Sequence, residues 1–432
     1  MNKTIGLDSH LILYKTHRDL IKKGIPIFVS GKGTRITDNK GNTYLDFVSG
    51  VTRPVHIGHG REEMARAIYE QICKLEYFTP MHYATEPSIE LADLLSNLLP
   101  RGIKYFTFVC DGSEAVETAF KLAKHYHVSK AERMRYKILA RKDAYHGVTG
   151  MTLPILGMLL PMRHVMEPLQ RITTFVEHPN CYRCPVHLKY PECDLFCARD
   201  IERTINFEGP ETISAFLGET IQHGVYPPPK EYWPIVQDIC KKYDIVLIAD
   251  EVVNGFGRTG KWFGYEHFDL NPDIIVLAKG ITSGYVPLGA VGCTKKIIEN
   301  VEEFNDLHTY GNHPVSCAAA LKNIEIIQRE DLISNSRIMG EYLLKGLKTF
   351  KNYPNVGEIR GAGGLWAAID FKADNEKGMF PIERLLSMIK KAKSKGLIIN
   401  LMGSAFEFAP PLIITEKEID EAIEILDEIL TQ

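Results

Sequence analysis

Residues 273–292, "DIIVLAKGITSGYVPLGAVG", place five consecutive apolar residues directly before Lys279 and follow it with a turn rich in glycine and serine. A short apolar run bounded by turn residues predicts a strand that is buried on both faces of a parallel sheet. Lys279 is therefore expected at the carboxyl end of that strand. Two interpretations are open: a lysine that leaves a strand end for solvent, or an amine kept out of water as a nucleophile.

Apolar strand candidates alternate with helix candidates on both sides of this stretch. "YFTFVC" (105–110) precedes a long segment with apolar residues at helical spacing, and "DIVLIADE" (244–251) follows the helical segment 232–243. This alternation is typical of an α/β domain whose mainly parallel sheet is covered by helices on both faces. The other strand candidates are 137–141, 211–219 and 289–294.

The two ends of the chain have a different pattern. Near the N-terminus, "TDNKGNTY" (37–44) predicts a turn between two strands. Long amphipathic helices follow residue 312, and Thr415 with Glu418 forms a capping-box pattern that opens the last of them. We predict a large domain over 59–312 and a smaller α+β domain built from 1–58 and 313–432.

The overall composition excludes several classes of protein. The chain has 432 residues, of which 45% are hydrophobic, and its formal net charge is −3. A near-neutral charge argues against nucleic acid as a partner, and no apolar run reaches the ~20 residues of a membrane span. The N-terminus also lacks the pattern of a secretory signal. We expect a soluble, cytoplasmic protein with no nucleic-acid or membrane partner.

Four of the nine cysteines are crowded into residues 181–197, "CYRCPVHLKYPECDLFC". A C-x2-C spacing occurs in zinc sites. The second pair is spaced differently and two prolines stiffen the loop, so reduced thiols that pack the loop are the alternative. We favour the thiols and expect no metal. The four residues are Cys181, Cys184, Cys193 and Cys197.

A loop with a glycine separates a strand from a helix in "VCDGSEAVETAF" (109–120). The first turn of a helix exposes unpaired N–H groups and the positive end of the helix dipole, which suits a phosphate. Gly112 and Ser113 supply that loop, and Ser113 adds a hydroxyl donor. The simpler interpretation is an N-cap with no ligand.

Asp250 and Lys279 end two successive strand candidates, so a parallel sheet brings both to one edge, where ligands bind in open α/β sheets. Tyr145–His146 follow the strand candidate 137–141 and offer an aromatic face. A phosphate cradle, a carboxylate, an amine and an aromatic platform are the four groups that pyridoxal 5′-phosphate (PLP) requires. The sequence therefore predicts a PLP site.

Four segments in this order resemble the class III aminotransferases, which have fold type I of the PLP-dependent transferases. They are "GSEA" (112–115), "YHG" (145–147), "DEVVNGFGRTG" (250–260) and "AKGITSGYVPLGAV" (278–291). The resemblance covers nearly the whole chain and implies a mainly parallel sheet of the seven-stranded type in the large domain. It also implies transfer of an amino group from an ω-amino acid or primary amine to a keto acid such as pyruvate.

The resemblance assigns roles to particular residues. Lys279 would form the Schiff base with PLP and move the proton at Cα, and Asp250 would pair with the pyridinium nitrogen. Gly112 and Ser113 would hold the phosphate. The other positions that it implies for the cofactor site are Tyr145 stacked on the ring, His146, Val252 on the opposite face, and Glu219.

The resemblance further implies a homodimer. Thr309, in "HTYGNHPVSCAAA" (308–320), matches a threonine that in this family reaches the phosphate of the neighbouring subunit. The active sites would then be shared between two copies of the chain.

The chain departs from the usual pattern of the family at the substrate side. Glu407, in "SAFEFAPPL", stands where family members usually carry an arginine that grips the substrate carboxylate. Another cation then binds the carboxylate, or the preferred substrate lacks one. Arg53 is the candidate cation, with a surface salt bridge as the alternative. Glu407 would either attract a second ammonium group or be an exposed charge. Phe78 and Tyr145 complete the expected substrate residues.

Other reactions use the same lysine and aspartate. The main alternative is a PLP-dependent isomerase: an amino acid racemase, epimerase or aminomutase. Val253 and Gly224, at positions where relatives carry glutamine and a gating glutamate, favour the branch that acts on terminal amines. A non-catalytic PLP-binding regulator is a third possibility, but no basic helix-turn-helix segment accompanies the motifs.

Overall fold

A central sheet forms the body of the molecule. The computed structural model describes residues 26–100, 102–373 and 380–431. The strand order is β4-β10-β9-β8-β7-β5-β6; β10 is antiparallel to both neighbours and the other pairings are parallel. The mainly parallel sheet predicted from the sequence is confirmed. Its strands are β4 (Ile103–Val109), β5 (Lys137–Arg141), β6 (Thr173–Val176), β7 (Ile213–Glu219), β8 (Val246–Asp250), β9 (Ile274–Leu277) and β10 (Gly289–Thr294).

The two faces of this sheet belong to two separate hydrophobic clusters. Along β8, Val246 and Ile248 pack in a cluster with α4, whereas Leu247 and Ala249 pack in the cluster that contains residues of α6 and α7. Successive side chains of a strand point to opposite faces, so a strand covered on both sides must be apolar throughout. This explains the uninterrupted apolar runs in the sequence.

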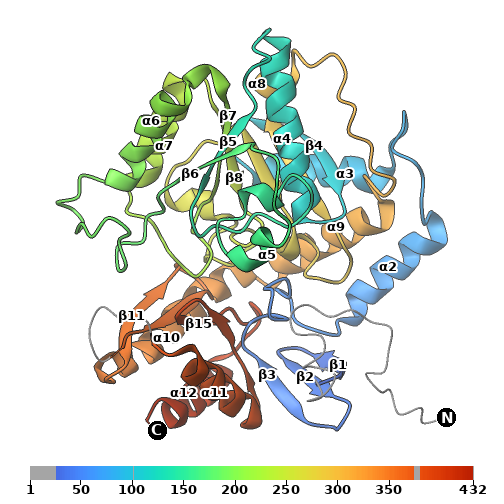
Figure 1. The fold of residues 1–432 in the computed structure, drawn as a ribbon. Coiled ribbons are helices and arrows are strands. Elements are labelled where there is room, and N and C mark those ends of the chain that lie inside the picture. Colours follow the sequence, from blue (N-terminus) through green and yellow to red (C-terminus); the bar gives the residue numbers. More distant parts are fainter. Residues whose placement is uncertain (1–25, 101, 374–379, 432) are drawn as a thin grey trace.

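Helices surround the sheet (Figure 1). α4 packs against β7, β9 and β10, α7 against β8, and α9 against α2 and α3. The helix expected after "YFTFVC" is therefore present as α4. The bounds are α2 (Glu62–Lys74), α3 (Glu86–Leu98), α4 (Gly112–Ser129), α5 (Leu160–His164), α6 (Phe196–Glu208), α7 (Tyr232–Lys242), α8 (Lys295–Ile298) and α9 (Pro314–Arg329).

The two ends of the chain meet beside the large sheet. In Figure 1 the blue N-terminal strands and the red C-terminal elements lie together at the bottom, and β13 pairs in parallel with β3 through Leu397 and Leu45. The predicted domain boundaries at 58 and 312 remain predictions. The elements are β1 (Phe28–Lys32), β2 (Arg35–Asp38), β3 (Thr43–Asp46), α10 (Leu332–Lys348), β11 (Val356–Gly361), β12 (Ala367–Phe371), α11 (Ile382–Ser394), β13 (Leu397–Ile398), β14 (Asn400–Met402), β15 (Ala405–Phe408) and α12 (Glu416–Leu430).

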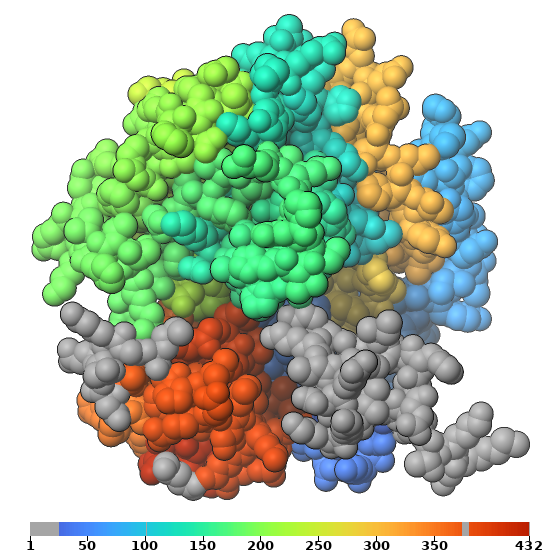
Figure 2. Space-filling model, viewed as in Figure 1, coloured from blue at the N-terminus to red at the C-terminus, as the bar shows by residue number. Residues whose placement is uncertain are grey.

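Two local predictions at the ends of the chain are confirmed. β2 and β3 form an antiparallel hairpin, and the Asp38 carboxylate accepts the N–H groups of Lys40 and Asn42 in its turn. At the start of α12, the Thr415 hydroxyl accepts the N–H of Glu418, and the Glu418 carboxylate accepts the N–H of Thr415. Figure 2 shows these terminal regions packed below the large domain. Among the described residues, no helix is long and apolar enough to cross a membrane.

Candidate active site

A cavity lies at the carboxyl edge of the parallel strands. β7 and β8 end at Glu219 and Asp250, which are paired in register, and Lys279 follows the end of β9 by two residues. All three side chains line the same cavity, whose volume is about 370 Å³. Small-molecule sites of roughly 300–1,000 Å³ are typical at this edge of α/β sheets. The structure thus brings Asp250 and Lys279 together, as the strand pattern predicted.

One wall of the cavity is the loop between β4 and α4. Asp111 caps the helix by accepting the N–H of Glu114 at 2.9 Å, so the backbone of Gly112 and Ser113 forms the first turn. Gly147 approaches this turn so closely that a Cβ there would lie 2.6 Å from the Ser113 hydroxyl. The loop with its hydroxyl and the positive end of an 18-residue helix forms an anion cradle.

Asp250 is held by two hydrogen bonds. It accepts the backbone N–H of Val252 at 3.0 Å and the ring Nδ1 of His146 at 2.7 Å. Both side chains are almost completely buried. His146 therefore acts on Asp250 directly, and Nε2 of its ring has no hydrogen-bond partner among the described residues. This fixes the orientation of the carboxylate that faces the cavity.

The neighbouring acids have different environments. Glu251 does not line the cavity: it accepts the N–H groups of Gly264 and Tyr265 at 2.7 and 2.9 Å, so of the two adjacent acids only Asp250 serves the site. Glu219 does line it, and burial raises the pKa of Glu219 to about 7. The charges of His146 and Arg141 oppose that increase. Near neutral pH Glu219 is thus poised between its two protonation states.

Lys279 has the environment of a nucleophilic amine. Burial lowers the pKa of Lys279 to about 8, and the charge of Arg53 adds to the decrease. The amine has no hydrogen-bond or ion-pair partner among the described residues. Its backbone φ is +45°, in the left-handed region, and such strained positions concentrate at functional sites. Lys279 is partly exposed and lines the cavity, so of the two interpretations the geometry favours an amine held inside the site over one that leaves the strand end for bulk solvent.

Tyr145 and Val252 both line the cavity, as expected for residues on either face of a flat ring. Thr309 and Phe78 do not line it, and both are exposed. Neither residue therefore contacts the cavity of its own chain, and a role in catalysis would place it at the cavity of a second copy of the chain. Their roles remain predictions.

The structure corrects two expectations about the substrate side. Arg53 does not form a surface salt bridge, and Glu407 is not an exposed charge: their side chains are 6% and 0% exposed, and Arg53 Nη1 donates to Glu407 Oε2 at 2.6 Å. Neither lines the cavity. Both expectations fail because the loop 49–53 packs against the end of β15. The guanidinium of Arg53 and the carboxylate of Glu407 meet there and neutralise each other's charge.

The sequence patterns did not identify two neighbours of this ion pair. Trp366 Nε1 donates to the other oxygen of Glu407 at 2.6 Å, and His223 lies 3.2 Å from Arg53 Nη2. His223 also approaches Glu219, with 3.9 Å between His223 Nδ1 and Glu219 Oε1. Its position four residues after Glu219 was the available signal. Nothing in the sequence around Trp366 indicated its contact.

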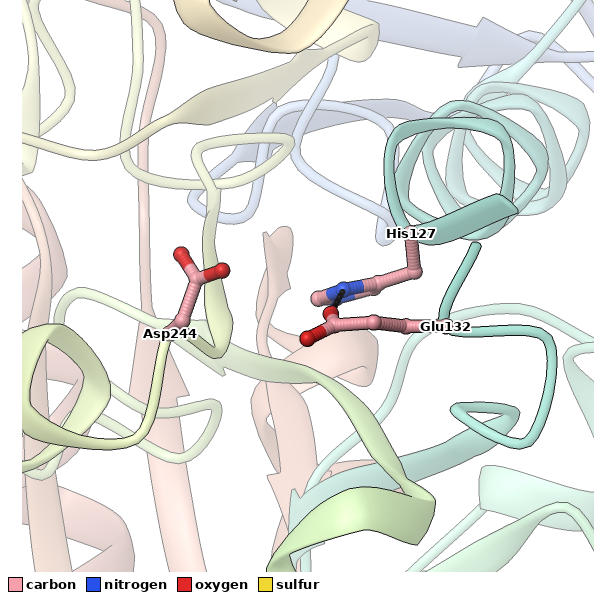
Figure 3. A group of neighbouring side chains, drawn as sticks. All are labelled: His127, Glu132 and Asp244. Atoms are coloured by element: carbon pink, nitrogen blue, oxygen red, sulfur yellow. Dashed lines mark hydrogen bonds and ion pairs between the residues drawn. The ribbon is translucent and has the colours of Figure 1, made fainter. Parts of the chain in front are cut away.

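A cluster with metal-ligand chemistry lies elsewhere. Figure 3 shows His127 facing Glu132, with Asp244 opposite. Arg135 and Lys130 already pair with these two carboxylates. His127 is 15 residues along α4 from Gly112, roughly 22 Å from the cradle. We assign it a structural role.

The four clustered cysteines are free thiols around a small second cavity. Among the described residues, the cysteine sulfurs do not form a group with the close mutual spacing of metal ligands. The structure therefore adds no support for the zinc interpretation.

Comparison with solved structures identifies the class of enzyme. An (S)-enantioselective ω-transaminase from Thermomicrobium roseum superimposes with a TM-score of 0.93 and 37% identity, covering 98% of this chain and 96% of the other. The chain therefore has fold type I of the PLP-dependent transaminases.

Sequence relatives give the family. The model for class III aminotransferases matches residues 22–430. A putrescine–pyruvate aminotransferase from Pseudomonas aeruginosa is 32% identical, with 100% of this chain and 96% of the relative covered. A taurine–pyruvate aminotransferase from Bilophila wadsworthia is 36% identical, with 94% and 92% covered. The chain belongs to the class III aminotransferase family, whose members use PLP.

Proposed function

We propose that this chain binds PLP in the cavity between Asp250 and Lys279 and transfers an amino group from an ω-amino acid or primary amine to a keto acid such as pyruvate. The observation that carries this proposal is the placement of both side chains on one cavity beside an anion cradle. When bound, PLP supplies an electron sink that stabilises negative charge at the substrate Cα.

The residues present fit this cofactor. Gly112 and Ser113 would hold its phosphate at the start of α4, and Asp250 would hold the proton of its ring nitrogen. The amine of Lys279 has no competing partner among the described side chains and is free to attach to the aldehyde. Tyr145 and Val252 border the space that the ring would occupy.

The chain's own residues would then move protons. Because the pKa of Lys279 is lowered to about 8, a larger fraction of its amine is neutral near pH 7 than for an ordinary lysine. The neutral amine would be able to remove the proton from the substrate carbon that bears the amino group and return it to the cofactor. Asp250, oriented by His146, would hold the proton of the ring nitrogen while the Lys279 amine moves the substrate proton. Glu219 lies opposite Asp250 on the neighbouring strand β7, and the charge of Asp250 contributes to the raised pKa of Glu219.

A donor-only experiment separates a transaminase from the isomerase alternative. Mixing the holoenzyme with a primary amine or ω-amino acid and no keto acid is expected to give one equivalent of pyridoxamine phosphate per active site and then stop. The reason is that the amine stays on the cofactor until an acceptor removes it. The absorbance change after mixing measures the amount of pyridoxamine phosphate formed per active site. Continuous turnover without an acceptor would identify an isomerase.

We also propose that the enzyme is a homodimer with shared active sites. Leu307 and Tyr310 are large exposed apolar side chains close in sequence to the exposed Thr309. The segment with the exposed Phe78 and Tyr83 adjoins them in space, because the rings of Tyr77 and Tyr310 lie 6.0 Å apart. Apolar surface of this kind marks a protein interface. Thr309 would reach the partner's phosphate cradle. The cytoplasmic location expected from the sequence remains a prediction.

Subunit mixing tests the shared site. Thr309→Ala and Lys279→Ala homodimers are each expected to have low activity at limiting PLP. If Thr309 serves the partner's cradle, a mixed dimer carries both changes in one site and none in the other. Activity should therefore reappear on denaturing and refolding the two variants together, with up to half of the wild-type activity per mixed dimer. Absence of complementation in verified mixed dimers would place Thr309 in the site of its own chain.

A further inference from the structure

The ion pair between Arg53 and Glu407 leaves several hydrogen-bond donors of the Arg53 guanidinium without a strong acceptor. Arg53 donates from Nη1 to Glu407, its Nη2 faces His223, and its Nε has no hydrogen-bond partner among the described residues. An arginine has five N–H donors in a fixed plane, and buried donors without acceptors are costly. Arg53 is 5% exposed, so water does not readily satisfy them.

Glu407, in contrast, is fully engaged. One of its oxygens accepts from Trp366 Nε1 at 2.6 Å, and the other accepts from Arg53 at 2.6 Å and from Asn400 Nδ2 at 3.4 Å. The carboxylate would keep two donors if the arginine shifted. Glu407 thus anchors one edge of Arg53 and leaves the other edge for a second acceptor.

A second buried arginine adds positive charge to this region. Arg258 donates to the carbonyls of Leu365 and Pro410 at 2.8 and 2.6 Å, and no described carboxylate lies within 4.0 Å of it. Asp46, whose charge also acts on Arg258, is bonded to His59 at 2.9 Å and to backbone N–H groups rather than to either arginine. Burial and the charge of Arg53 together lower the pKa of Arg258 to about 9, and the charges of Glu407 and Asp46 oppose that decrease. The two guanidinium groups thus lie close enough to repel each other, and an anion bound at the free edge of Arg53 would relieve that repulsion.

His223 separates Arg53 from the cavity. It contacts Arg53 on one side, and on the other it approaches Glu219 and the ring of Tyr145, with ring centroids 6.1 Å apart. Glu219 and Tyr145 line the cavity, whereas His223 and Arg53 do not. Burial and the charge of Arg53 hold the pKa of His223 well below its usual range, so the ring is neutral. A carboxylate is a stronger acceptor for a guanidinium than a neutral imidazole.

We propose that Arg53 binds the anionic end of both substrates, that His223 moves aside when it does so, and that Glu407 orients the guanidinium. The donor is then an amine whose far end carries a carboxylate or sulfonate, and the keto acid uses the same subsite in the second half of the reaction. A diamine is disfavoured because its second ammonium group would meet the cationic edge of Arg53. This inference rests on the proposed aminotransferase function.

Matched donors test the inference in the holoenzyme. An ω-amino acid, the alkylamine of the same chain length and the corresponding diamine are compared at three, four and five carbons by the rate of pyridoxamine phosphate formation. The wild type is expected to rank the acid first and the diamine last. In Arg53→Gln/Glu407→Gln, which removes both charges together, the acid-to-alkylamine ratio of kcat/KM should fall on the order of 100-fold.

Two single variants keep the test decisive if the double variant fails to fold. Glu407→Gln retains Arg53 without its counter-ion, so the KM of the acid donor should fall while that of the diamine rises. His223→Ala removes the competing acceptor and should lower the KM of the acid donor by a similar factor. A purely structural role would change all three donors equally.

The outcomes distinguish this inference from the proposed function. If no amine forms pyridoxamine phosphate although Lys279 holds the cofactor, the aminotransferase proposal fails. If amines react but the acid has no advantage over the diamine in the wild type, only the role of Arg53 fails. An unchanged acid-to-alkylamine ratio in the folded variants leads to the same conclusion.

Discussion

Replacing Lys279 by alanine is expected to remove both the covalent attachment of PLP and the turnover. No other lysine lines the cavity among the described residues, so no second amine can take over. Loss of a group that moves the proton at Cα alone lowers a rate by ~10²–10⁴-fold. Loss of the covalent link adds to this, so we expect a decrease in kcat of at least about 10⁴-fold. The visible absorbance of the lysine-bound cofactor should disappear as well.

Borohydride reduction followed by peptide mass spectrometry provides the direct measurement. In the wild type the pyridoxyl group should be found on the peptide that contains Lys279, and in Lys279→Ala on none. Lys345→Ala is the matched control, because Lys345 is an exposed lysine on α10 that does not line the cavity. Labelling of any other lysine in the wild type would overturn the assignment and every role built around it.

The arrangement of the large domain could be predicted because its strands are buried on both faces. Continuous apolar runs such as 245–249 are stable only when both faces of the strand are buried, as in the interior of a parallel sheet. The carboxyl ends of such parallel strands lie at the same edge of the sheet. The two polar residues that end neighbouring strands, Glu219 and Asp250, were therefore placed in register by the fold. The motifs around Lys279 and Gly112 lie on these ends, so the cofactor side of the cavity followed from sequence order.

The substrate side could not be predicted in the same way. Arg53 and Glu407 are 354 residues apart in the chain, and no local pattern indicates that one would neutralise the other. Their contact depends on how the N-terminal segment packs on β15, which is set by the pairing of β13 with β3 and by the bond from Ala409 N–H to the Phe47 carbonyl. Tertiary contacts of this kind are decided by the whole domain rather than by periodicity. The contact of His223 with Arg53 likewise depends on the tertiary structure and could not be predicted from the sequence.

Replacing Asp250 by asparagine is expected to preserve the cofactor link and to slow the chemistry. Asparagine retains one side-chain oxygen for the N–H of Val252, and its NH2 group can donate to Nδ1 of His146 when the proton of that ring is on Nε2, so the fold of the loop should persist. It removes the negative charge that keeps the ring nitrogen protonated, and with it the stabilisation of charge developing at Cα. We expect kcat to decrease on the order of 10³-fold, as for the loss of one preorganised electrostatic partner.

The kinetic isotope effect makes this prediction specific to proton removal. With a donor deuterated at the carbon that bears the amine, Asp250→Asn should show a larger effect on kcat than the wild type, because proton removal becomes the slow step. Asp238→Asn, an exposed aspartate on α7, is the matched control and should behave as the wild type. A variant that keeps its lysine-bound absorbance but loses less than about tenfold in kcat would show that another group holds the ring nitrogen, because a single electrostatic partner at this position is expected to contribute more.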